Sequence, residues 1–376
     1  MRILYLGESL QIHDFRFIEK LVEKEYDTHV VTFTDKPIKL KGATYHNFPM
    51  YEDPMSHSRF VGDIIYIKNL VRQRSFIQKL IDELKPDILH AGWIPSHGLM
   101  AAISGFHPFL LMPWGSDVLV IPQNASYLTK KQIAWTIKKA DMITCDAEYV
   151  KNEIMRLSGY PENKIIVFPW GIDLEKFNPK VNGNKIRAKL GWEDKKILIM
   201  TRSFQKIYGI EYFLKTLPKL IKKNDNVRVL LCGDGPLKND FEKYIHSKKL
   251  SKYVHLAGRI ENDDLPKYLA ASDVYVSTSL SDGTSVSLLE AMAVGLPCIV
   301  TDLPAIREWI TDGHNGFLVP KKDSYAVYEK LDLLLNNDGL REEFGERNLI
   351  IAQHRADWNK NFTKLEKIYA KLSTNC

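Results

Sequence analysis

Short apolar runs alternate with longer amphipathic segments along the whole chain. RILYL, THVVTF, DILHA, FLLMP, MITC and KIIVF have the length and β-branched content of buried strands, and helical patterns such as FIEKLVEKE lie between them. The alternation starts again at KILIMT and continues through VRVLLCG, YVHLAG, DVYVS, PCIVT and GFLVP. Strands that alternate with helices form parallel sheets covered on both faces, so the pattern predicts an α/β fold with two doubly wound, Rossmann-like domains.

The segment PWGIDLEKFNPKVNGN at 169–184 separates the two series, and its Pro, Gly and Asn content favours a linker. A chain of 376 residues is also longer than one hydrophobic core favours. Apolar residues recur at helical spacing in the last stretch, ADWNKNFTKLEKIYAKL. We therefore expect an N-terminal domain of residues 1–175, to which a C-terminal helix at 356–376 returns, and a C-terminal domain of residues 176–355.

The stretch SLSDGTSVSLLEAMAVGLPCIVTD at 279–302 combines a loop of small residues with a helix that Thr284 or Ser285 can cap and that ends at Gly295. The backbone N–H groups of residues 283–285 and the positive end of the helix dipole suit a phosphate. Glu290 lies about 7 Å further along the axis, at about 1.5 Å per residue, where a carboxylate could reach ribose hydroxyls. A solvated glutamate beside an ordinary helix cap explains the stretch equally well.

Other strand exits in the second half carry residues that suit a polyanion. Arg202 and Lys206 follow the first strand and could meet a diphosphate, although such residues are more often surface charges. Gly233 in LLCGDGP would let a ligand approach the backbone, and a plain turn explains it as well. Gly258 and Arg259 leave another strand. Because the carboxyl ends of parallel strands meet at one edge of a sheet, four such exits together favour a binding site.

Composition narrows the classes of function. The net charge is +6, and the first 170 residues hold 20 basic against 19 acidic residues, which argues against dedicated nucleic-acid binding. Four scattered cysteines fit free thiols in a reducing compartment, so we expect a cytoplasmic protein. No run reaches the roughly 18 to 20 apolar residues of a spanning helix. The basic and apolar segments 66–79 and 129–140 could seat an anionic lipid headgroup at the inner face of a membrane, or be solvated helix faces.

Together, SDGTSVSLLEAMAVGLPCIVTD, GDGPLKNDFEKY, TDGHNGFLVP and VFPWGIDLEKFNP resemble the retaining glycosyltransferases of family 4, over nearly the whole chain. The resemblance implies the GT-B architecture of two facing Rossmann-like domains. It also implies transfer of a sugar from a UDP-, GDP- or ADP-linked donor to a hydroxyl of a glycolipid, a polysaccharide or a small glycoside. The chain has no D-x-D motif, and we expect no metal and no other cofactor.

The family signature of two acids separated by seven residues is here Asp282 to Glu290, with Asp where Glu is usual. The resemblance implies that Asp282 contacts the donor sugar, residues 283–285 the diphosphate and Glu290 the ribose, and that Arg202 binds phosphate. The expected catalytic residues are Asp282, Arg202, Lys206 and His90. The expected donor-binding residues are Gly7, Gly233, Gly258, Arg259, Gly283, Thr284, Ser285, Val286 and Glu290.

The chain departs from the family pattern at several positions. The partner lysine of the family aligns with Tyr208, so either Lys206 supplies that charge or it is missing. The first strand is followed by GESLQIHD instead of a Gly-Gly loop, which leaves Gly7 as the match. The family often has an H-x-H pair in the first domain, and LHAGW keeps only its first histidine, so His90 and His97 are both candidates for the catalytic histidine.

The acceptor should bind mainly to the first domain, where His97, Trp114 and Asp117 are candidate sugar contacts. Packing of the tryptophan and helix capping by the aspartate are the alternatives. Two other classes of function stay open. An NAD-dependent oxidoreductase would need the G-x-G-x-x-G fingerprint, and Lys238 stands where its third glycine would be. A sugar-nucleotide epimerase, or a nucleotide-binding relative without catalysis, could share the same two-domain body.

Overall fold

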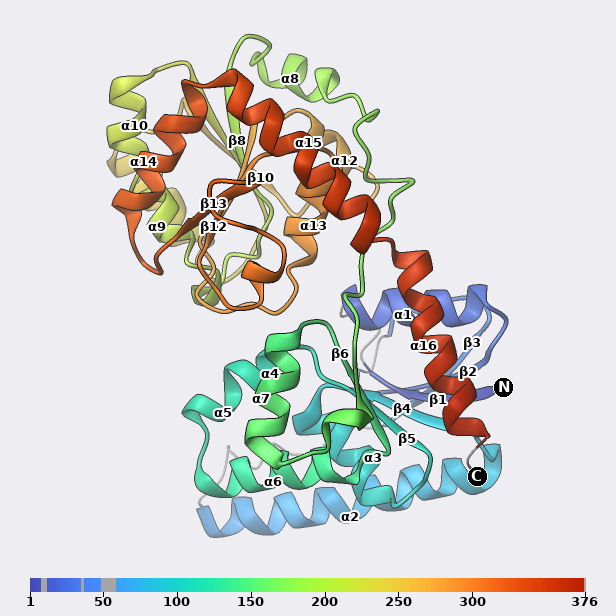
Figure 1. The fold of residues 1–376 in the computed structure, drawn as a ribbon. Coiled ribbons are helices and arrows are strands. Elements are labelled where there is room, and N and C mark those ends of the chain that lie inside the picture. Colours follow the sequence, from blue (N-terminus) through green and yellow to red (C-terminus); the bar gives the residue numbers. More distant parts are fainter. Residues whose placement is uncertain (8–11, 35–36, 49–58, 375–376) are drawn as a thin grey trace. The chain divides into compact units, whose positions relative to one another are not determined.

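The computed structural model describes residues 1–7, 12–34, 37–48 and 59–374. They form two compact units, Met1–Phe168 with Lys364–Cys376, and Pro169–Thr363. Each unit is a parallel sheet flanked by helices (Figure 1). The α/β class and the presence of two Rossmann-like domains, predicted from the alternation of apolar runs, are confirmed.

Within the described residues, the N-terminal sheet has seven parallel strands in the order β3-β2-β1-β4-β5-β6-β7. Their bounds are β1 Arg2–Leu6, β2 Asp27–Thr32, β3 Ala43–Asn47, β4 Ile88–Gly92, β5 Phe109–Met112, β6 Met142–Cys145 and β7 Ile165–Val167. Every residue of β4 and β5 is buried, because both faces of a central parallel strand are covered. Sequence analysis did not predict β3. Its sequence, ATYHN, is polar and largely uncovered, as an edge strand allows.

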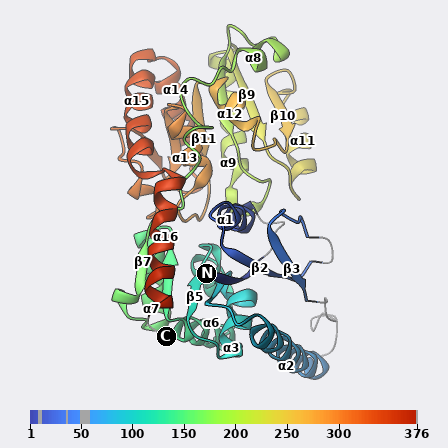
Figure 2. The same cartoon turned by 90° about the vertical axis from the view of Figure 1, so that its right-hand side faces the viewer.

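Helices cover this sheet and complete its core (Figure 2). They are α1 Ile12–Glu23, α2 Arg59–Leu84, the π-helix η2 Ile94–Gly98, α3 Leu99–Ser104, α4 Ser116–Leu119, α5 Ile121–Asn124, α6 Tyr127–Lys139, α7 Glu148–Ser158 and the 3₁₀ turn η3 Glu162–Lys164. The C-terminal helix α16 (Trp358–Ser373) returns to this unit, as predicted. Leu365 and Tyr369 of α16 are fully buried, and the Tyr369 ring lies 5.8 Å from that of Tyr26.

In the C-terminal unit, the described residues form a sheet of six parallel strands in the order β10-β9-β8-β11-β12-β13. The strands are β8 Lys196–Met200, β9 Val227–Cys232, β10 Val254–Gly258, β11 Val274–Ser277, β12 Cys298–Thr301 and β13 Gly316–Val319. The helices are α8 Asn184–Leu190, η4 Lys206–Tyr208, α9 Ile210–Leu214, α10 Leu217–Lys223, α11 Lys238–Ser247, α12 Leu265–Ala270, α13 Val286–Ala293, η5 Ile306–Glu308, α14 Ser324–Leu335 and α15 Asp338–Arg355.

Alternate residues of these strands feed two apolar cores, one on each face of the sheet. Leu198 and Met200 of β8 pack with helices α9, α10, α11 and α14, whereas Ile197 and Ile199 pack with α12, α13 and α15. All six strands run the same way, so the loops that leave β8, β9, β10 and β11 emerge at the same edge from neighbouring strands. This edge is where the sequence places the candidate donor residues.

The division between the units falls after Phe168, before the expected boundary at 175/176. Backbone hydrogen bonds explain the difference. The Ile172 N–H donates to the Ala356 carbonyl at 2.7 Å, and the Trp358 N–H donates to the Ile172 carbonyl at 3.0 Å. The start of the expected linker is therefore bound to the end of α15 and belongs to the C-terminal unit. Helix α16 passes from one unit to the other at Thr363/Lys364.

Candidate functional site

The loop after β8 places Arg202 at the carboxyl edge of the C-terminal sheet. Its Nη1 donates hydrogen bonds to Ser285 Oγ at 3.0 Å and to Ser287 Oγ at 2.9 Å. Its Nη2 pairs with Asp282 Oδ2 at 2.6 Å. A planar guanidinium held by three fixed acceptors has one orientation. The structure thus brings together three of the residues that the sequence singled out, from two strand exits: Arg202, Asp282 and Ser285.

Helix α13 begins with Ser285 as its N-cap residue, but the Ser285 side chain makes no capping hydrogen bond to the helix backbone. The hydroxyl instead accepts from Arg202. Ser285 is thus at the N-cap position, as the sequence allowed, but its hydroxyl bonds the guanidinium instead of the helix backbone. The entrance of α13 keeps the positive end of the helix dipole beside Arg202, so two sources of positive potential meet there.

Sequence analysis missed two hydroxyls of this site. The Ser287 hydroxyl bonds the guanidinium, and the Tyr275 hydroxyl bonds Ser287. Ser287 Oγ lies 2.8 Å from the Tyr275 hydroxyl and 3.2 Å from Ser285 Oγ. Tyr275 is fully buried in β11, and this burial raises the pKa of its hydroxyl to about 12, although Arg202 opposes the rise. The phenol therefore stays neutral and able to donate. A tyrosine inside a strand, followed by the hydroxyl-rich TSVS, is the signal that could have identified the pair.

Tyr208 covers one face of the guanidinium, with the ring centroid 4.0 Å from the Arg202 Cζ atom. An aromatic face attracts a cation, typically by about 0.5 to 2 kcal/mol. The chain thus has a neutral ring where the resemblance placed a lysine. Among the described residues, Arg202 Nε is buried and has no hydrogen-bond partner. One strong donor of the site is therefore unused.

The Arg202–Asp282 pair is the dominant electrostatic feature of the site. The side chains are only 9% and 17% exposed. Burial is the largest single influence on the pKa of Arg202 and lowers it, but Asp282, Tyr208 and Tyr275 together outweigh burial, so the net shift of the Arg202 pKa is upward. Burial raises the pKa of the Asp282 carboxyl, and Arg202, the Ser285 hydroxyl and the Gly283 N–H oppose this rise. A charge-assisted bond of 2.6 Å is typical of an ionised pair, so the site holds a fixed cation whose charge is partly neutralised.

Glu290 lies one and a half turns inside α13, and only 9% of its surface is exposed. Its neighbours in sequence, Leu289 and Ala291, belong to the apolar core on that face of the sheet. The alternative of a solvated surface glutamate is therefore wrong. A buried carboxylate in a short apolar helix is costly unless polar groups face it, which fits a residue retained for binding.

The glycines that the sequence singled out occupy their positions for different structural reasons. A Cβ at Gly233 would overlap the backbone carbonyl of Arg202, so only glycine lets the loop after β9 pack against the loop after β8. Gly258 has φ +71° at the end of β10 with open space around it. Gly283 is buried, and Val286 opens α13. Arg259 is exposed.

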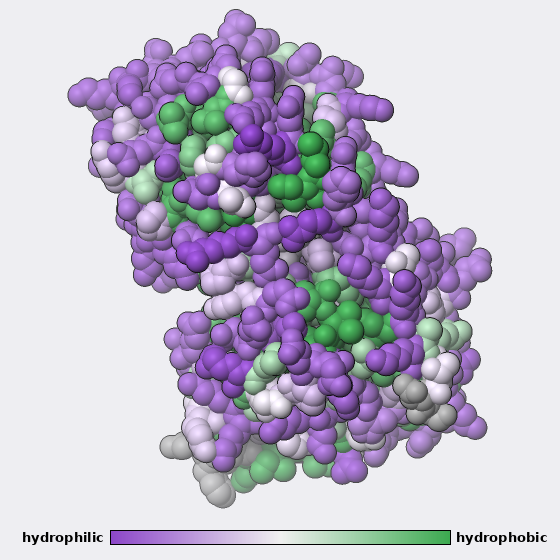
Figure 3. Space-filling model, viewed as in Figure 1, coloured by the Kyte–Doolittle hydropathy of each residue, from purple (hydrophilic) through white to green (hydrophobic). Residues whose placement is uncertain are grey.

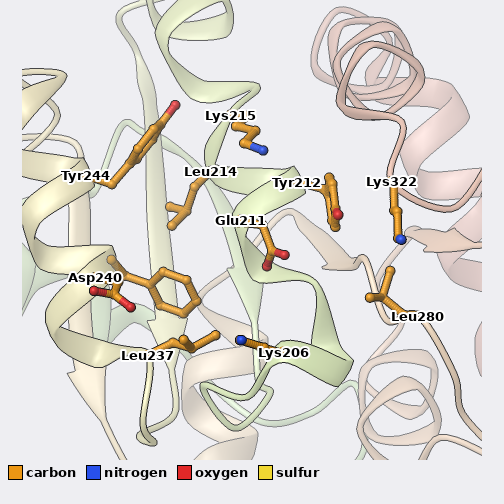
Figure 4. A pocket seen from close by; sticks show the side chains of 11 residues that line it. Lys206, Glu211, Tyr212, Leu214, Lys215, Leu237, Asp240, Tyr244, Leu280 and Lys322 are labelled. Carbon is orange, nitrogen blue, oxygen red and sulfur yellow. The ribbon is translucent and has the colours of Figure 1, made fainter. Parts of the chain in front are cut away.

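Lys206 lies apart from the polar cluster around Arg202. It is exposed and lines a groove of about 390 Å³ between α9 and α11 (Figure 4). Leu237 and Leu280, which follow β9 and β11, line the same groove. Lys206 is thus at the correct edge of the sheet, beside the loop that leads to Asp282.

The structure does not support the catalytic assignment of His90. Its side chain is fully buried in β4, and Nδ1 lies 2.6 Å from the Tyr369 hydroxyl of α16. The Tyr5 ring packs edge-on against the imidazole with centroids 4.9 Å apart. Burial lowers the pKa of His90 to about 3, so it stays neutral. We therefore assign His90 to the core of the N-terminal unit, where its Nε2 is also buried and has no hydrogen-bond partner among the described residues.

The same reasoning corrects the interpretation of Asp117. Its carboxylate is fully buried and accepts hydrogen bonds from the N–H groups of Ile94 and Trp114, each at 3.0 Å. Burial raises its pKa to about 6. Asp117 therefore ties together the loops after β4 and β5, and we no longer count it as a sugar contact.

Among the other candidates in the N-terminal unit, only Trp114 keeps an accessible surface beside a polar group. It is partly exposed, and the His13 ring stacks on it with centroids 5.3 Å apart. His97 is buried in η2, against the ring of Phe33 at 4.7 Å. A Cβ at Gly7 would come within 2.6 Å of Asp14 Oδ1, so packing alone requires that glycine. The loop residues that follow Gly7, 8–11, lie outside the described residues.

The three cysteines of the described residues, Cys145, Cys232 and Cys298, are buried and free, as predicted, and Cys376 lies outside that part. No group of three or more His, Cys, Asp or Glu residues in the described part of the chain is arranged to hold a metal ion. Over the same residues, every helix is too short or too polar to cross a bilayer.

Two family models match the chain. Residues 2–147 match the model of glycosyl transferase 4-like domains, and residues 182–351 match that of glycosyl transferases group 1. An uncharacterized glycosyltransferase of Methanocaldococcus jannaschii is 24% identical, over 98% of this chain and 96% of its own. The N-acetyl-alpha-D-glucosaminyl L-malate synthase of Bacillus anthracis is 27% identical, over 75% of this chain and 74% of its own.

Solved structures agree with the fold. Anabaena HepE, in complex with UDP and glucose, matches with a TM-score of 0.80 at 17% identity, over 99% of this chain and all of that chain. Sucrose-phosphate synthase of Thermosynechococcus elongatus matches with a TM-score of 0.80 at 16% identity, over the full length of both chains. Two family models cover the two units in order, and the fold is that of GT-B enzymes. The chain therefore belongs to the group 1 glycosyltransferases of family 4 type.

Proposed function

We propose that this glycosyltransferase moves a hexose, with retention of configuration and without a metal ion, from a nucleoside-diphosphate sugar to an acceptor hydroxyl. The observation that carries the proposal is the guanidinium of Arg202, fixed by Asp282, Ser285 and Ser287 at the entrance of α13. UDP is the first nucleotide to test, because Anabaena HepE was solved with UDP and with UDP-glucose.

The reaction needs negative charge to be stabilised where the sugar–phosphate bond breaks. The leaving nucleoside diphosphate gains charge while positive charge develops at the anomeric carbon. Fixed donors that are already oriented stabilise such a transition state without reorganisation. The unused Nε of Arg202 and the first N–H groups of α13 are donors of this kind. Lys206, at the edge of the neighbouring groove, supplies the second positive charge in place of a lysine at Tyr208.

The remaining residues of the C-terminal unit hold the rest of the donor. Glu290 binds the ribose hydroxyls, because it lies about 7 Å along α13 from the diphosphate position. Asp282 commits Oδ2 to Arg202 and offers Oδ1 to the donor sugar. Gly258, which has open space around it, lets the donor approach the backbone, and Arg259 lies beside it, whereas Gly233 holds the loop that carries Arg202 in place. Retention then requires no protein nucleophile: the leaving phosphate oxygen accepts the proton of the incoming hydroxyl on the same face.

The acceptor is a hydroxyl of a glycolipid, a polysaccharide or a small glycoside, and binds to the N-terminal unit. Trp114, stacked on His13, offers an aromatic surface for a sugar ring. Cell-envelope polysaccharide synthesis is the expected context, since one relative is a putative teichuronic acid biosynthesis glycosyltransferase of Bacillus subtilis. Free buried cysteines support a reducing, cytoplasmic location.

Product analysis tests the proposal. The chain is incubated with UDP-, GDP- and ADP-sugars, with and without an acceptor panel, in EDTA. We expect nucleoside diphosphate release that depends on an acceptor, and a product whose anomeric NMR coupling matches that of the donor. Isomerised donor without acceptor would instead identify an epimerase, and an inverted product would exclude retention. Arg202→Ala should lose the activity. Arg156→Ala, which removes an exposed guanidinium from α7 of the N-terminal unit, is its matched control.

A further inference from the structure

Helix α6 of the N-terminal unit leaves large apolar side chains on the surface. Tyr127, Leu128 and Trp135 are 70%, 75% and 41% exposed. The opposite side of the helix is packed, since Ile133 and Ile137 are buried. A helix that already buries one apolar side gains nothing in the folded monomer from exposing a second. These exposed residues therefore indicate a contact with something outside the chain.

The same side of α6 is basic. Lys131, Lys138 and Lys139 are exposed, and α6 carries no acidic residue over its length. Lys131 Nζ lies 4.7 Å from the Tyr127 ring centroid, and Lys139 Nζ lies 5.4 Å from that of Trp135. Aromatic rings and ammonium groups thus alternate along one side of the helix. Rings that combine an apolar body with a polar tip, beside lysines, are typical of the interface between lipid headgroups and acyl chains.

Helix α2 extends this surface. Ile64, Ile67 and Val71 are all more than half exposed, and their spacing places them on one stripe of the helix. The Tyr66 hydroxyl donates to Gln132 Oε1 of α6 at 2.8 Å, so the two helices lie side by side there. Figure 3 shows hydrophobic residues reaching the lower edge of the N-terminal unit, where Figure 1 draws α2.

Exposed basic residues also accompany the apolar stripe of α2. Lys68 and Arg74 are exposed within the same stretch of the helix. Farther along α2, Lys79 is paired with Glu83 at 3.7 Å, so we leave it out of this surface. We call the exposed residues of both helices the α2–α6 face: Ile64, Ile67, Lys68, Val71, Arg74, Tyr127, Leu128, Lys131, Trp135, Lys138 and Lys139.

We propose that the α2–α6 face docks the protein on an anionic lipid bilayer. A bilayer fits better than a folded partner, because the named residues of the face carry charge of one sign, spread over two helices. The open hollow of about 650 Å³ that Val71 and Arg74 line extends along α2 to Asp82 and Glu83, away from α6. Apolar side chains insert between headgroups while the lysines stay at the level of the phosphates. Each lysine near an anionic surface strengthens binding severalfold, and salt weakens the attraction. The inference does not depend on the identity of the donor nucleotide or on the proposed catalytic residues.

Vesicle sedimentation tests this proposal. We expect the full chain to pellet with phosphatidylcholine vesicles that contain 30% phosphatidylglycerol, and to remain in solution with pure phosphatidylcholine or at 0.5 M NaCl. K131Q/K138Q/K139Q should weaken binding by about tenfold or more. Y127S/L128S should weaken it severalfold at unchanged charge. K222Q/K243Q/K248Q, which removes three exposed lysines of the C-terminal unit, is the matched control and should bind within twofold of wild type.

Several outcomes would overturn the proposal. Wild-type protein that stays in the supernatant with anionic vesicles would do so, whatever the variants do. So would equal losses in the α6 and control lysine variants, because these would indicate attraction by net charge alone. Binding of duplex RNA through the same lysines, tighter than binding of vesicles, would replace the bilayer with a nucleic acid. Circular dichroism and the thermal midpoint of each variant show that a loss of binding is not a loss of fold.

Discussion

The two sheets of this chain both bury polar side chains near the ends of their central strands, but the partners of these side chains differ. In the N-terminal unit, Asp117 accepts from two backbone N–H groups, whereas His90 bonds to Tyr369 through Nδ1 and its buried Nε2 has no hydrogen-bond partner among the described residues. In the C-terminal unit, Arg202 is held by three side chains and still has an unused Nε donor. An open hydrogen-bonding position is therefore not enough to identify a site. Arg202 differs from His90 because it is a charged group in the loop after a strand, held there by three polar side chains.

Removal of the Arg202 guanidinium should have the largest effect. We expect Arg202→Ala to lower kcat/KM for sugar transfer by about 10²- to 10³-fold, as loss of a main charge-stabilising donor does. Arg202→Lys should recover only part of this, because an ammonium cannot hold three partners and a ligand at once. Steady-state kinetics and calorimetric UDP titration measure both. Unchanged kinetics in Arg202→Ala would mean that the network serves stability alone.

Glu290→Gln should come next. The amide keeps the size of the side chain but weakens a charge-assisted hydrogen bond to a hydroxyl, so we expect about a 10- to 100-fold loss of donor affinity. The effect should appear in KM for the donor more than in kcat. Leu289→Met, one residue away in the apolar core, is the control for disturbance of α13. Equal losses in both variants would show that Glu290 acts through packing.

We expect His90 to make the stability of the protein depend on pH, and not its activity. Its pKa is about 3 in the folded protein, against about 6.5 in an unfolded chain, so only the unfolded state gains a proton as the pH falls below 6.5. The contribution of the neutral His90 to the free energy of unfolding is therefore complete above pH 6.5 and is lost as the pH falls toward 3. Between pH 7 and pH 5 the loss is about 2 kcal/mol.

The contribution of Asp117 to the free energy of unfolding changes in the opposite direction over the same pH range, because its folded pKa of about 6 lies above the unfolded value of about 3.8. Urea unfolding of wild type and His90→Gln at pH 7 and pH 5 isolates the histidine. The stability difference between the two proteins should change by about 2 kcal/mol. An unchanged difference would mean that the imidazole reaches solvent in the native state.

Tyr369→Phe should have the smallest effect, and only on stability. It removes the hydroxyl that bonds His90 Nδ1 and leaves the rings in place, so we expect a loss of about 1 to 2 kcal/mol of unfolding free energy. Transfer activity should stay within about twofold of wild type. A large loss of kcat at full stability would return His90 to the list of functional residues and weaken the contrast between the two units.

The sequence predicted most of the fold because the parallel strands are buried on both faces. RILYL and KILIMT, for example, form β1 and β8, whereas the polar edge strand β3 has no such pattern. The site was harder to predict. Glu290 and Arg202 could be singled out from their positions after strands, but spacing alone could not tell a solvated Glu290 from a buried one. The role of Ser287 depends on its contact with Arg202, 85 residues away, which no local pattern encodes. Tyr208 and Tyr275 contact residues close in sequence, but their roles become clear only once Arg202 is placed.

For His90, the sequence could not show which group the side chain contacts. A histidine after an apolar run could face a ligand or a partner, and its partner lies 279 residues further along the chain. Only the return of α16 decides between the two. Sequence patterns therefore identify buried strands better than they identify the partner of a single buried polar group.

The shared helix α16 also bears on how the protein is made. The last strand of the N-terminal sheet ends at Val167, yet the helix that fills its core is translated only after the whole C-terminal sheet. At about 5 to 20 residues per second, the nascent N-terminal unit waits roughly 10 to 40 seconds for Tyr369. A chain that stops before α16 would keep the C-terminal sheet and leave the core of the N-terminal unit open, which a protease could recognise and remove.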